Sequence, residues 1–524
     1  MLLRPSAAGR VPTVVGWLLG AACLAYLLAL PPTLNGADES FTLYGAKRIL
    51  QGQVLYRDFF DFLTPGSFYL YALAYAVGGV SITTARVTTA LLNALSVVCT
   101  YFLTLYVASM AEAILAGLLV VVICVPVWNM ASHHWLATAF GLAAAAVLLA
   151  PGWQGSTRAR PAAAGALAGL LVCSHQTRGV WLVLWLAVAV PSLVIGRRDG
   201  ARWRQAVREL AWTAAGGAAA GVPLLGYAVW RASFDEVRYA THTWVLRNYR
   251  SYNVGKFRWA SYGAFWAGGL KYTSLRLMQA TPALLAVEAL GVLWAVWRRG
   301  LRLALVRLLV LLLALSAVGA IMYFPDIVHI AFVLPYVLVV LGGMLFRVRT
   351  WLVRSQAPAV RTVMRVAWAA ALALVLGKAW TNGRIAWEES PVLYETAFGT
   401  LAGSDLQART LQDLREKVPA DGTAPARLFA YPTDAWLYLA LPADNPTPFA
   451  LLRPVYNTPE QMQTAIDRLE QDPRALVLVD GLMVKPDDPF VAYLRLRWRD
   501  VAGVGPPVFL GAPLFRLYAR DPAG

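Results

Sequence analysis

The chain has 524 residues, of which 58% are hydrophobic and only 14% are charged, and its mean hydropathy is +0.54. These values exclude an ordinary soluble protein and predict an integral membrane protein. The formal net charge of +17 would suit nucleic-acid binding, but the basic residues fall in short clusters between apolar segments. That pattern sets the orientation of a membrane protein, so we expect a lipid bilayer and no nucleic acid as a partner.

An α-helix needs about 20 apolar residues to cross the hydrocarbon core of a bilayer. By this measure residues 1–380 form a transmembrane domain of about eleven helices. The predicted spans are 13–31, 84–107, 112–128, 134–150, 162–175, 179–196, 210–230, 278–297, 304–324, 328–346 and 364–380. Segment 67–79 is apolar but only about 13 residues long, which favours a re-entrant or interfacial helix over a further span.

The basic clusters indicate how the spans are oriented. If segment 67–79 does not cross, all the clusters fall on one side, and the positive-inside rule makes that side cytoplasmic. The clusters are Arg4/Arg10, Arg158/Arg160, Arg197–Arg208, Arg298–Arg307 and Arg347–Arg365. The sequence therefore predicts a multi-pass protein of the cytoplasmic membrane with its N-terminus inside. The outer loops 32–83 and 231–270, and residues 381–524, then lie outside.

The first outer loop gathers four carboxylates, Asp38, Glu39, Asp58 and Asp61, in a chain that is otherwise poor in acid. Ionisable groups collected at one place in a membrane protein predict a functional site. The alternative is that four acids in a polar loop only solvate it. The topology also places every histidine at or near the outer surface, namely His133, His134, His175, His242 and His329. We therefore expect any chemistry to occur outside.

Loop 231–270 interleaves arginine and lysine with tyrosine and tryptophan. This mixture suits phosphate recognition through charge-assisted hydrogen bonds. It suits an interfacial aromatic belt with snorkelling basic residues equally well. Glu288 falls in the middle of a predicted span, where a buried partner is expected for it.

Residues 381–524 contain no 20-residue apolar run and predict a small soluble α/β domain on the outer side. Residues 427–431, 475–480 and 514–518 have the pattern of strands, and Pro459–Gln471 has the pattern of an amphipathic helix. The domain contains no GxGxxG motif and no P-loop, so the sequence does not indicate nucleotide binding.

Common soluble-enzyme signatures are absent as well, because the chain has no Walker A, HExxH or GxSxG motif. Nucleotide-activated substrates are not available outside the cytoplasmic membrane, so an enzyme there needs a donor carried by lipid, such as a sugar on a polyprenyl phosphate. Such an enzyme requires a carboxylate that deprotonates an acceptor hydroxyl. It also requires basic groups that neutralise the leaving phosphate and an apolar groove for the prenyl tail.

The first outer loop carries a pattern that supports this chemistry. After one span it begins with Asp38-Glu39 and continues A-K-R-I-L-x-G-x-x-L-Y-R-D-F-F-D-x-x-x-P-G into a short apolar helix. This layout resembles the GT-C superfamily of integral-membrane glycosyltransferases. It is most similar to the bacterial branch grouped with protein O-mannosyltransferases and the aminoarabinose transferases of lipid A (glycosyltransferase families 39 and 83). The resemblance implies inverting transfer of a sugar from a polyprenyl-phosphate donor to an acceptor hydroxyl or phosphate.

The resemblance also implies residue roles. Asp38 matches the catalytic carboxylate, which makes it the expected general base, and Glu39 matches its acidic neighbour. The phosphate-contacting lysine of the aminoarabinose transferases is missing, because this chain has Leu63-Thr64-Pro65-Gly66 where they have Lys-Pro-Pro-Leu. The candidates for that role are Arg57, Arg86, Arg178 and Arg247, which are predicted to lie on the outer side, and His329 is a further polar candidate. The remaining candidates for binding the substrate are Asp58, Asp61, His133, His134 and His242.

No cofactor is predicted. Asp38, Glu39, Asp58 and the outer histidines have the right chemistry for a divalent metal, but no spacing is diagnostic of a site, so a metal stays open. Two alternatives to a transferase also stay open, a lipid-linked sugar transporter or flippase and a non-catalytic membrane scaffold. Replacing Asp38 with Asn separates them, since a scaffold would keep its function and a transporter would lose transport but no bond-making step.

Overall fold

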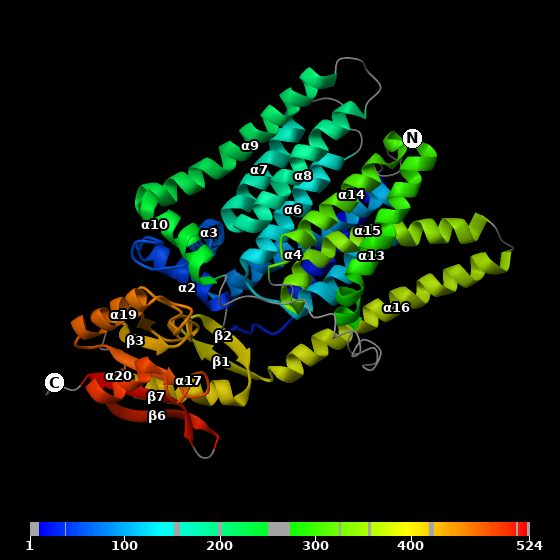
Figure 1. Cartoon of the computed structure of the whole chain (residues 1–524). Coiled ribbons are helices and arrows are strands. Elements are labelled where there is room, and N and C mark those ends of the chain that lie inside the picture. The colour runs from blue at the N-terminus through cyan, green and yellow to red at the C-terminus, as the bar shows by residue number, and fades with distance from the viewer. Residues whose placement is uncertain are drawn as a thin grey trace.

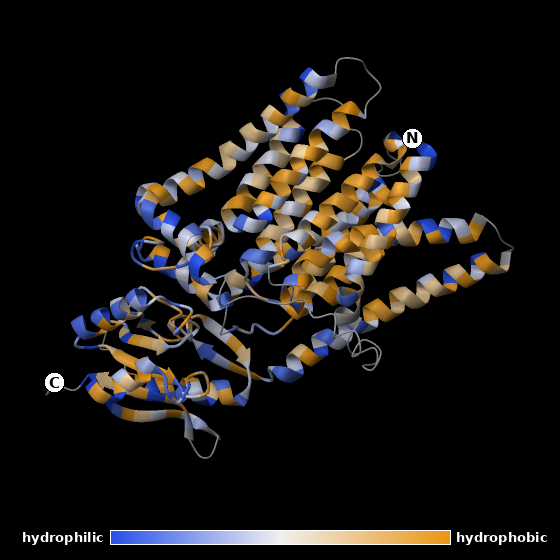
Figure 2. Cartoon of the chain, viewed as in Figure 1, coloured by the Kyte–Doolittle hydropathy of each residue, from blue (hydrophilic) through white to orange (hydrophobic). Residues whose placement is uncertain are grey.

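The computed structural model describes residues 10–36, 38–150, 158–196, 202–249, 273–323, 326–354, 358–418, 424–509 and 512–520. A bundle of helices makes up the first part of the chain, and a sheet with flanking helices makes up the last (Figure 1). Hydrophobic residues dominate the bundle, whereas the sheet region, residues 392–520, is mixed in polarity (Figure 2). The protein is a mostly helical, multi-span membrane protein with a C-terminal α/β region, as predicted.

The helices of the first part follow one another along the chain. They are α1 (Arg10–Leu28), α2 (Asp38–Leu50), α3 (Gly66–Gly78), α4 (Ile82–Val107), α5 (Met110–Leu119), α6 (His133–Leu149), α7 (Ala159–Ser174), α8 (Gln176–Ile195), α9 (Arg202–Arg231), α10 (Phe234–Arg238), η4 (Tyr239–Tyr249), α13 (Thr273–Arg299), α14 (Leu301–Gly319), α15 (Ile327–Arg354) and α16 (Pro358–Glu389). A π-turn, Val120–Cys124, and a 3-10 turn, Val125–Val127, prolong α5.

Each of the eleven predicted spans falls on one of these helices. Eight are long and apolar enough to cross a membrane alone, whereas α6 and α7 are apolar but shorter and α9 begins with a charged turn. The segment predicted as too short to cross is α3, which has 13 residues. The start of α1 and the sheet region lie at opposite ends of the bundle (Figure 1).

Small residues allow α7 and α9 to pack closely. A Cβ atom added at Gly165 of α7 would lie 1.9 Å from the carbonyl oxygen of Thr213 on α9, and one at Gly169 would lie 2.3 Å from that of Gly217. Glycine pairs four residues apart let membrane helices approach until their backbones touch. This contact fixes α7, and with it the turn that joins α7 to α8.

The sheet region contains a hairpin and a five-stranded mixed sheet. The strands of this sheet are ordered β4-β3-β5-β7-β6, with β3 parallel to both β4 and β5 and the remaining pairs antiparallel. The elements are β1 (Val392–Thr396), β2 (Gly399–Gly403), α17 (Asp405–Lys417), β3 (Ala426–Tyr431), α18 (Leu437–Ala440), β4 (Ala443–Asp444), α19 (Pro459–Gln471), β5 (Leu476–Asp480), α20 (Pro489–Arg497), β6 (Trp498–Phe509) and β7 (Ala512–Arg520). The three predicted strands correspond to β3, β5 and β7, and the predicted helix is α19.

Helix α2 packs directly on the sheet region. The ring of Tyr44 stacks on Tyr438 with 4.5 Å between centroids, and its hydroxyl accepts a hydrogen bond of 3.0 Å from the backbone N–H of Asn445. Lys47 donates to the carbonyl oxygen of Tyr438 at 2.6 Å. The helix that begins with Asp38 therefore shares one hydrophobic core with residues about 400 positions later in the chain.

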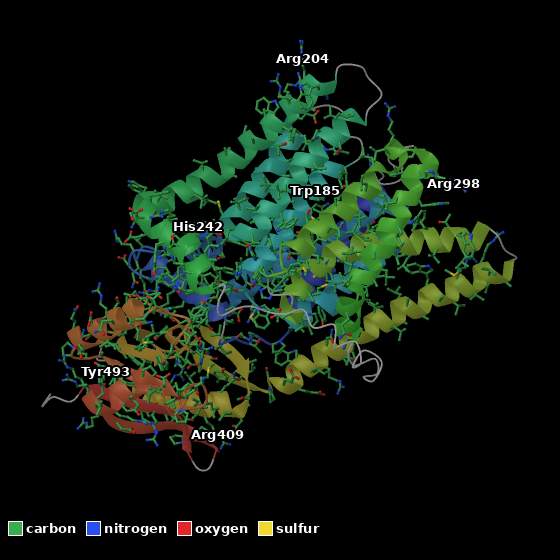
Figure 3. All side chains as sticks on the ribbon, viewed as in Figure 1. Trp185, Arg204, His242, Arg298, Arg409 and Tyr493 are labelled. Atoms are coloured by element: carbon green, nitrogen blue, oxygen red, sulfur yellow. The ribbon has the colours of Figure 1, made fainter. Side chains whose placement is uncertain are left out.

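Buried charges at the opposite end of the bundle are paired. Glu288 of α13 accepts hydrogen bonds from Arg307 of α14, at 2.5 and 3.0 Å, and from Arg347 of α15. Arg349 pairs with Glu112 at 2.6 Å. The buried partner expected for Glu288 is thus present. Figure 3 shows Arg204 and Arg298 at this far end, whereas His242 lies near the sheet region.

Candidate functional site

Asp38 is the first residue of α2, and its side chain is exposed. The surrounding protein removes hydration from the carboxyl group and so raises its pKa, while the nearby His329 lowers it and Asp326 raises it. Among the residues that the structure describes, no side chain pairs with the Asp38 carboxylate. A carboxylate that is accessible, unpaired and more basic than usual is suited to accept a proton.

Glu39, the next residue, has the opposite environment. It is fully buried and forms a bidentate ion pair with Arg86 of α4, at 2.6 and 2.9 Å. It also accepts hydrogen bonds from the backbone N–H groups of Ala131, at 2.7 Å, and Asn35, at 2.9 Å. Glu39 therefore fastens the start of α2 to α4 and to the turn before α6. Its contacts fit a positioning role, and Arg86 is engaged in the same pair.

Asp61 lies close enough to Asp38 for the two charges to interact. The pKa of Asp61 is raised to about 7, mainly by loss of hydration and in part by the charge of Asp38. The hydrogen bond from the N–H of Leu63 opposes this rise. The neighbouring Phe62 stacks on Trp244 of η4, with 5.3 Å between ring centroids. Helix η4 thus covers the loop that presents Asp61.

Histidines from three helix starts meet beside these acids. His133 and His134 begin α6, and His175 occupies the turn between α7 and α8. The ring centroids are 4.0 Å apart for His133 and His134, 5.2 Å for His133 and His175, and 4.9 Å for His134 and His175. The ring of His329, in the first turn of α15, is 4.8 Å from that of His134. We call His133, His134 and His175 the histidine cluster.

Arg178 adds a buried positive charge to this group. It follows His175 by one helical turn and donates hydrogen bonds to the carbonyl oxygen of His134, at 2.9 Å, and to the hydroxyl of Thr138, at 3.1 Å. The N-terminal ends of α6, α8 and α15 also converge here, and each carries the partial positive charge of a helix dipole. The combination of a guanidinium group with helix N-termini favours a bound anion.

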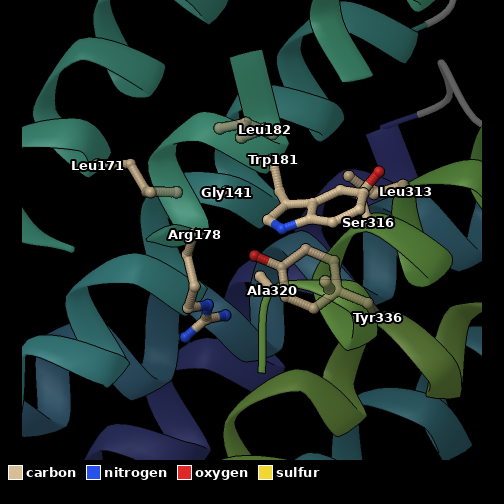
Figure 4. Close-up of a pocket in the computed structure, with 10 residues that line it drawn as sticks. Gly141, Leu171, Arg178, Trp181, Leu182, Leu313, Ser316, Ala320 and Tyr336 are labelled. Carbon is tan, nitrogen blue, oxygen red and sulfur yellow. The ribbon is translucent and has the colours of Figure 1, made fainter. Parts of the chain in front are cut away.

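An apolar pocket adjoins this positive region. It is narrow, with a cavity volume of about 20 Å³, and lies among α6, α7, α8, α14 and α15. Figure 4 shows Arg178 and the hydroxyl of Tyr336 at its wall together with apolar side chains such as Leu171, Trp181 and Leu182. The pocket therefore joins a charged wall to a hydrophobic interior.

Other predicted site residues lie apart from the histidine cluster. Arg57 and Asp58 pair with each other at 2.9 Å on the surface, and the hydrogen bond from Arg57 holds the pKa of Asp58 below its usual range. His242 and Arg247 are exposed on η4, and among the described residues no contact joins either one to the cluster. Residues 250–270 of loop 231–270 lie outside the described residues.

The structure also adds residues that the sequence did not select. His175 joins the cluster, and Asp326 lies 2.7 Å from Nδ1 of His329. Both lie in short turns between apolar segments. In the sequence, the only sign of a functional role for either one was its position as a polar residue at the end of a span. His175 lies 41 residues from His134, so their contact depends on how α6, α7 and α8 pack.

The fold was then compared with known proteins. No model of a known protein family matches the sequence, and no curated protein matches it. Among solved structures, ArnT from Cupriavidus metallidurans bound to undecaprenyl phosphate matches 98% of this chain and 99% of its own, with a TM-score of 0.59 and 15% identity. The chain has the GT-C fold.

Two further structures with the GT-C fold support this result. The oligosaccharyltransferase of Archaeoglobus fulgidus matches 88% of this chain and 68% of its own, with a TM-score of 0.50 and 14% identity. The arabinofuranosyltransferase AftD from Mycobacteria matches 97% of this chain but 40% of its own, also with a TM-score of 0.50 and 14% identity. The resemblance seen in the first outer loop therefore extends to the fold of nearly the whole chain.

Proposed function

We propose that this protein transfers a sugar from a polyprenyl-phosphate donor to an acceptor hydroxyl or phosphate, with inversion and with Asp38 as the general base. The observation that carries the proposal is the juxtaposition, within the GT-C fold, of the unpaired Asp38 carboxylate and a buried positive region. The acids and the positive region come from segments far apart in the sequence. They meet at the end of the bundle next to the sheet region.

The chemistry follows from this juxtaposition. The acceptor oxygen forms a bond to the anomeric carbon of the sugar while Asp38 takes the proton of the acceptor hydroxyl. The bond from that carbon to the phosphate oxygen breaks, and the electron pair leaves with the prenyl phosphate. Attack from the side opposite the leaving group inverts the anomeric centre. The lipid phosphate is a stable anion, so the reaction needs no second carboxylate to protonate it.

Arg178 and the N-terminal ends of α6, α8 and α15 supply the stabilisation of that phosphate. This assignment gives Arg178 the role of the lysine that is missing from Leu63-Thr64-Pro65-Gly66. Fixed positive groups in a site with little water stabilise developing negative charge strongly, because they need no reorganisation during the reaction. Among the predicted basic candidates, Arg178 is the buried one beside the histidine cluster.

The apolar pocket beside Arg178 marks where the first part of a prenyl chain would enter, and its cavity of about 20 Å³ would have to widen to hold the chain. Its walls are hydrophobic, and the guanidinium group stands at its edge, where the phosphate of a lipid would lie. ArnT, which shares the fold at 15% identity, was solved with undecaprenyl phosphate bound. This relationship supports the same class of lipid as the donor here.

The orientation of the chain belongs to the same proposal. The basic clusters favour a cytoplasmic location for the far end of the bundle. The active site and the sheet region would then face the outside of a bacterial cytoplasmic membrane, where a lipid-linked donor is needed.

The test uses the full chain in nanodiscs with a panel of short-chain prenyl-phosphate sugars, and it follows the release of prenyl phosphate. We expect release by the wild type and by Asp58→Asn, a matched control in the same loop, but not by Asp38→Asn. Equal release by Asp38→Asn and the wild type would overturn the assignment of the base. Translocation of an intact donor across the membrane without release would instead show a transporter.

A further inference from the structure

The histidine cluster combines three imidazole rings in a way that no step of the proposed transfer uses. Their ligand nitrogens, one from each ring, all lie within 4.8 Å of one another. Each of His133, His134 and His175 is at least nine-tenths buried. The rings come from two separate turns, so their meeting is a product of the tertiary fold.

Several nitrogens of the cluster have no partner. Nδ1 of His134 and both ring nitrogens of His175 form no hydrogen bond with any described residue. The face of the His134 ring is covered by Phe332, which stacks on it with 4.6 Å between centroids. A buried polar atom without a partner lowers stability. Nitrogens without partners on both the His134 and the His175 ring therefore point to a ligand that the two rings share.

We propose that His133, His134 and His175 bind one divalent transition-metal ion of the zinc class. Neutral imidazole nitrogen is a preferred ligand of zinc, whereas magnesium and calcium require oxygen ligands. A tetrahedral zinc ion holds its nitrogen ligands at about 2.0–2.1 Å, which places them roughly 3.4 Å from one another. The rings reach this spacing by closing around the ion by about 1.4 Å or less, which is within the reach of side-chain rotation.

The charges nearby are compatible with a cation. Arg178 and the N-terminal ends of α6, α8 and α15 disfavour one, although the guanidinium group already donates hydrogen bonds to the carbonyl oxygen of His134 and the hydroxyl of Thr138. Negative charge lies one ring away from the cluster, because Asp38 and Asp326 interact with His329, whose ring centroid is 4.8 Å from that of His134.

Three protein ligands leave one tetrahedral position open, as in catalytic zinc sites. Water would fill this position when no donor is bound. On the basis of the proposed function, an oxygen of the donor phosphate would replace that water. The metal would then act as a Lewis acid on the leaving group, beside Arg178.

The experiment measures metal binding without a donor, so its result is independent of the proposed transfer. The full-length protein in detergent is stripped with a chelator, reloaded with zinc or cobalt and desalted, and its metal content is measured by mass spectrometry. We expect one ion per chain for the wild type and for His242→Ala, an exposed histidine that serves as the matched control. We expect none for His134→Ala and His175→Ala.

A spectroscopic variant separates ligation from loss of folding. His175→Cys keeps a zinc ligand, so it should still bind cobalt and should add a thiolate-to-cobalt charge-transfer band that the wild type lacks. Added zinc should also raise the Tm of the wild type but not that of His175→Ala. The proposal is overturned if the wild type retains no stoichiometric metal, if His134→Ala and His175→Ala retain as much as the wild type, or if folded His175→Cys binds cobalt without the new band.

Discussion

The two ends of the helical bundle differ in whether their buried polar groups are paired. At the far end, Glu288 and Glu112 are each matched with arginine. At the end next to the sheet region, the Asp38 carboxylate and several histidine nitrogens have no partner among the residues that the structure describes. On α15, Arg347 follows His329 by eighteen residues, which is roughly 27 Å of helix. One helix therefore joins a region where charge stabilises the fold to a region where charge is available for chemistry.

Glu39 is the exception that clarifies this difference. It lies at the sheet end beside Asp38, yet it is paired as completely as Glu288. Neighbouring carboxylates thus divide into one that holds the backbone and one that is free to react. A candidate catalytic group is therefore recognised by its lack of a partner, and its position in the bundle is not sufficient.

Among the basic residues, the largest effect is expected from Arg178. Arg178→Gln should slow prenyl-phosphate release about a hundredfold, because it removes fixed positive charge from the leaving phosphate. The measurement is kcat with saturating donor, with thermal unfolding recorded in parallel. The matched variant Arg349→Gln at the far end should lower Tm and leave the kcat of the folded protein unchanged. The comparison would fail if the two variants behaved alike.

A paired acid should matter for folding instead of turnover. Glu288→Ala should lower the free energy of unfolding by about 3 kcal/mol, because it leaves Arg307 and Arg347 without a counter-charge in a poorly hydrated site. Chemical unfolding in detergent, followed by tryptophan fluorescence, measures the change. An unchanged stability would show that water reaches the far end and screens these arginines.

Asp61, an acid without a basic partner among the described residues, should have the opposite effect on stability. The folded pKa of Asp61 is raised to about 7, so ionisation above that pH occurs at a cost in the native state. The stability that protonated Asp61 allows is fully present near pH 4 and is lost as the pH rises through 7. Asp61→Asn should therefore be more stable than the wild type at pH 8, by about 4 kcal/mol, and nearly equal to it at pH 4. Unfolding curves at the two pH values would contradict this if the gain appeared at the lower one.

The smallest effect is expected from the exposed pair of Arg57 and Asp58. Asp58→Asn should change the free energy of unfolding by less than about 1 kcal/mol, because solvent screens a surface ion pair. The measurement is again chemical unfolding, compared at low and high salt. A large loss would show that Asp58 acts through its hydrogen bond to the N–H of Val54, at 2.7 Å, instead of through Arg57.

The sequence predicted the helices well because length and apolarity determine membrane spans. It did not predict the π-turn Val120–Cys124, because an extra residue in a helical turn leaves no mark on hydropathy. Strands β3, β5 and β7 were readable as short apolar runs. Strand β6 was not, since it contains glycine and two prolines and gains its pairing from β7.

The candidate site was only partly predictable. Asp38 and Glu39 were readable through the pattern around them, but nothing in a single sequence separates their roles. The two roles differ because the two side chains leave α2 in different directions. Glu39 points toward Arg86, whereas Asp38 stays exposed. The histidine cluster required the packing of α6, α7 and α8, and the exposure of His242 and Arg247 required the course of η4.

The packing of α2 on the sheet region has a consequence for how the protein is made. Synthesis proceeds from the N-terminus, so α2 leaves the ribosome long before Tyr438 and Asn445, against which Tyr44 packs. Until those residues arrive, the helix that carries Asp38 lacks much of its core. A nascent chain released before that point would insert its membrane helices and still lack an ordered reaction centre. The protein therefore becomes active only after the last third of the chain has been made.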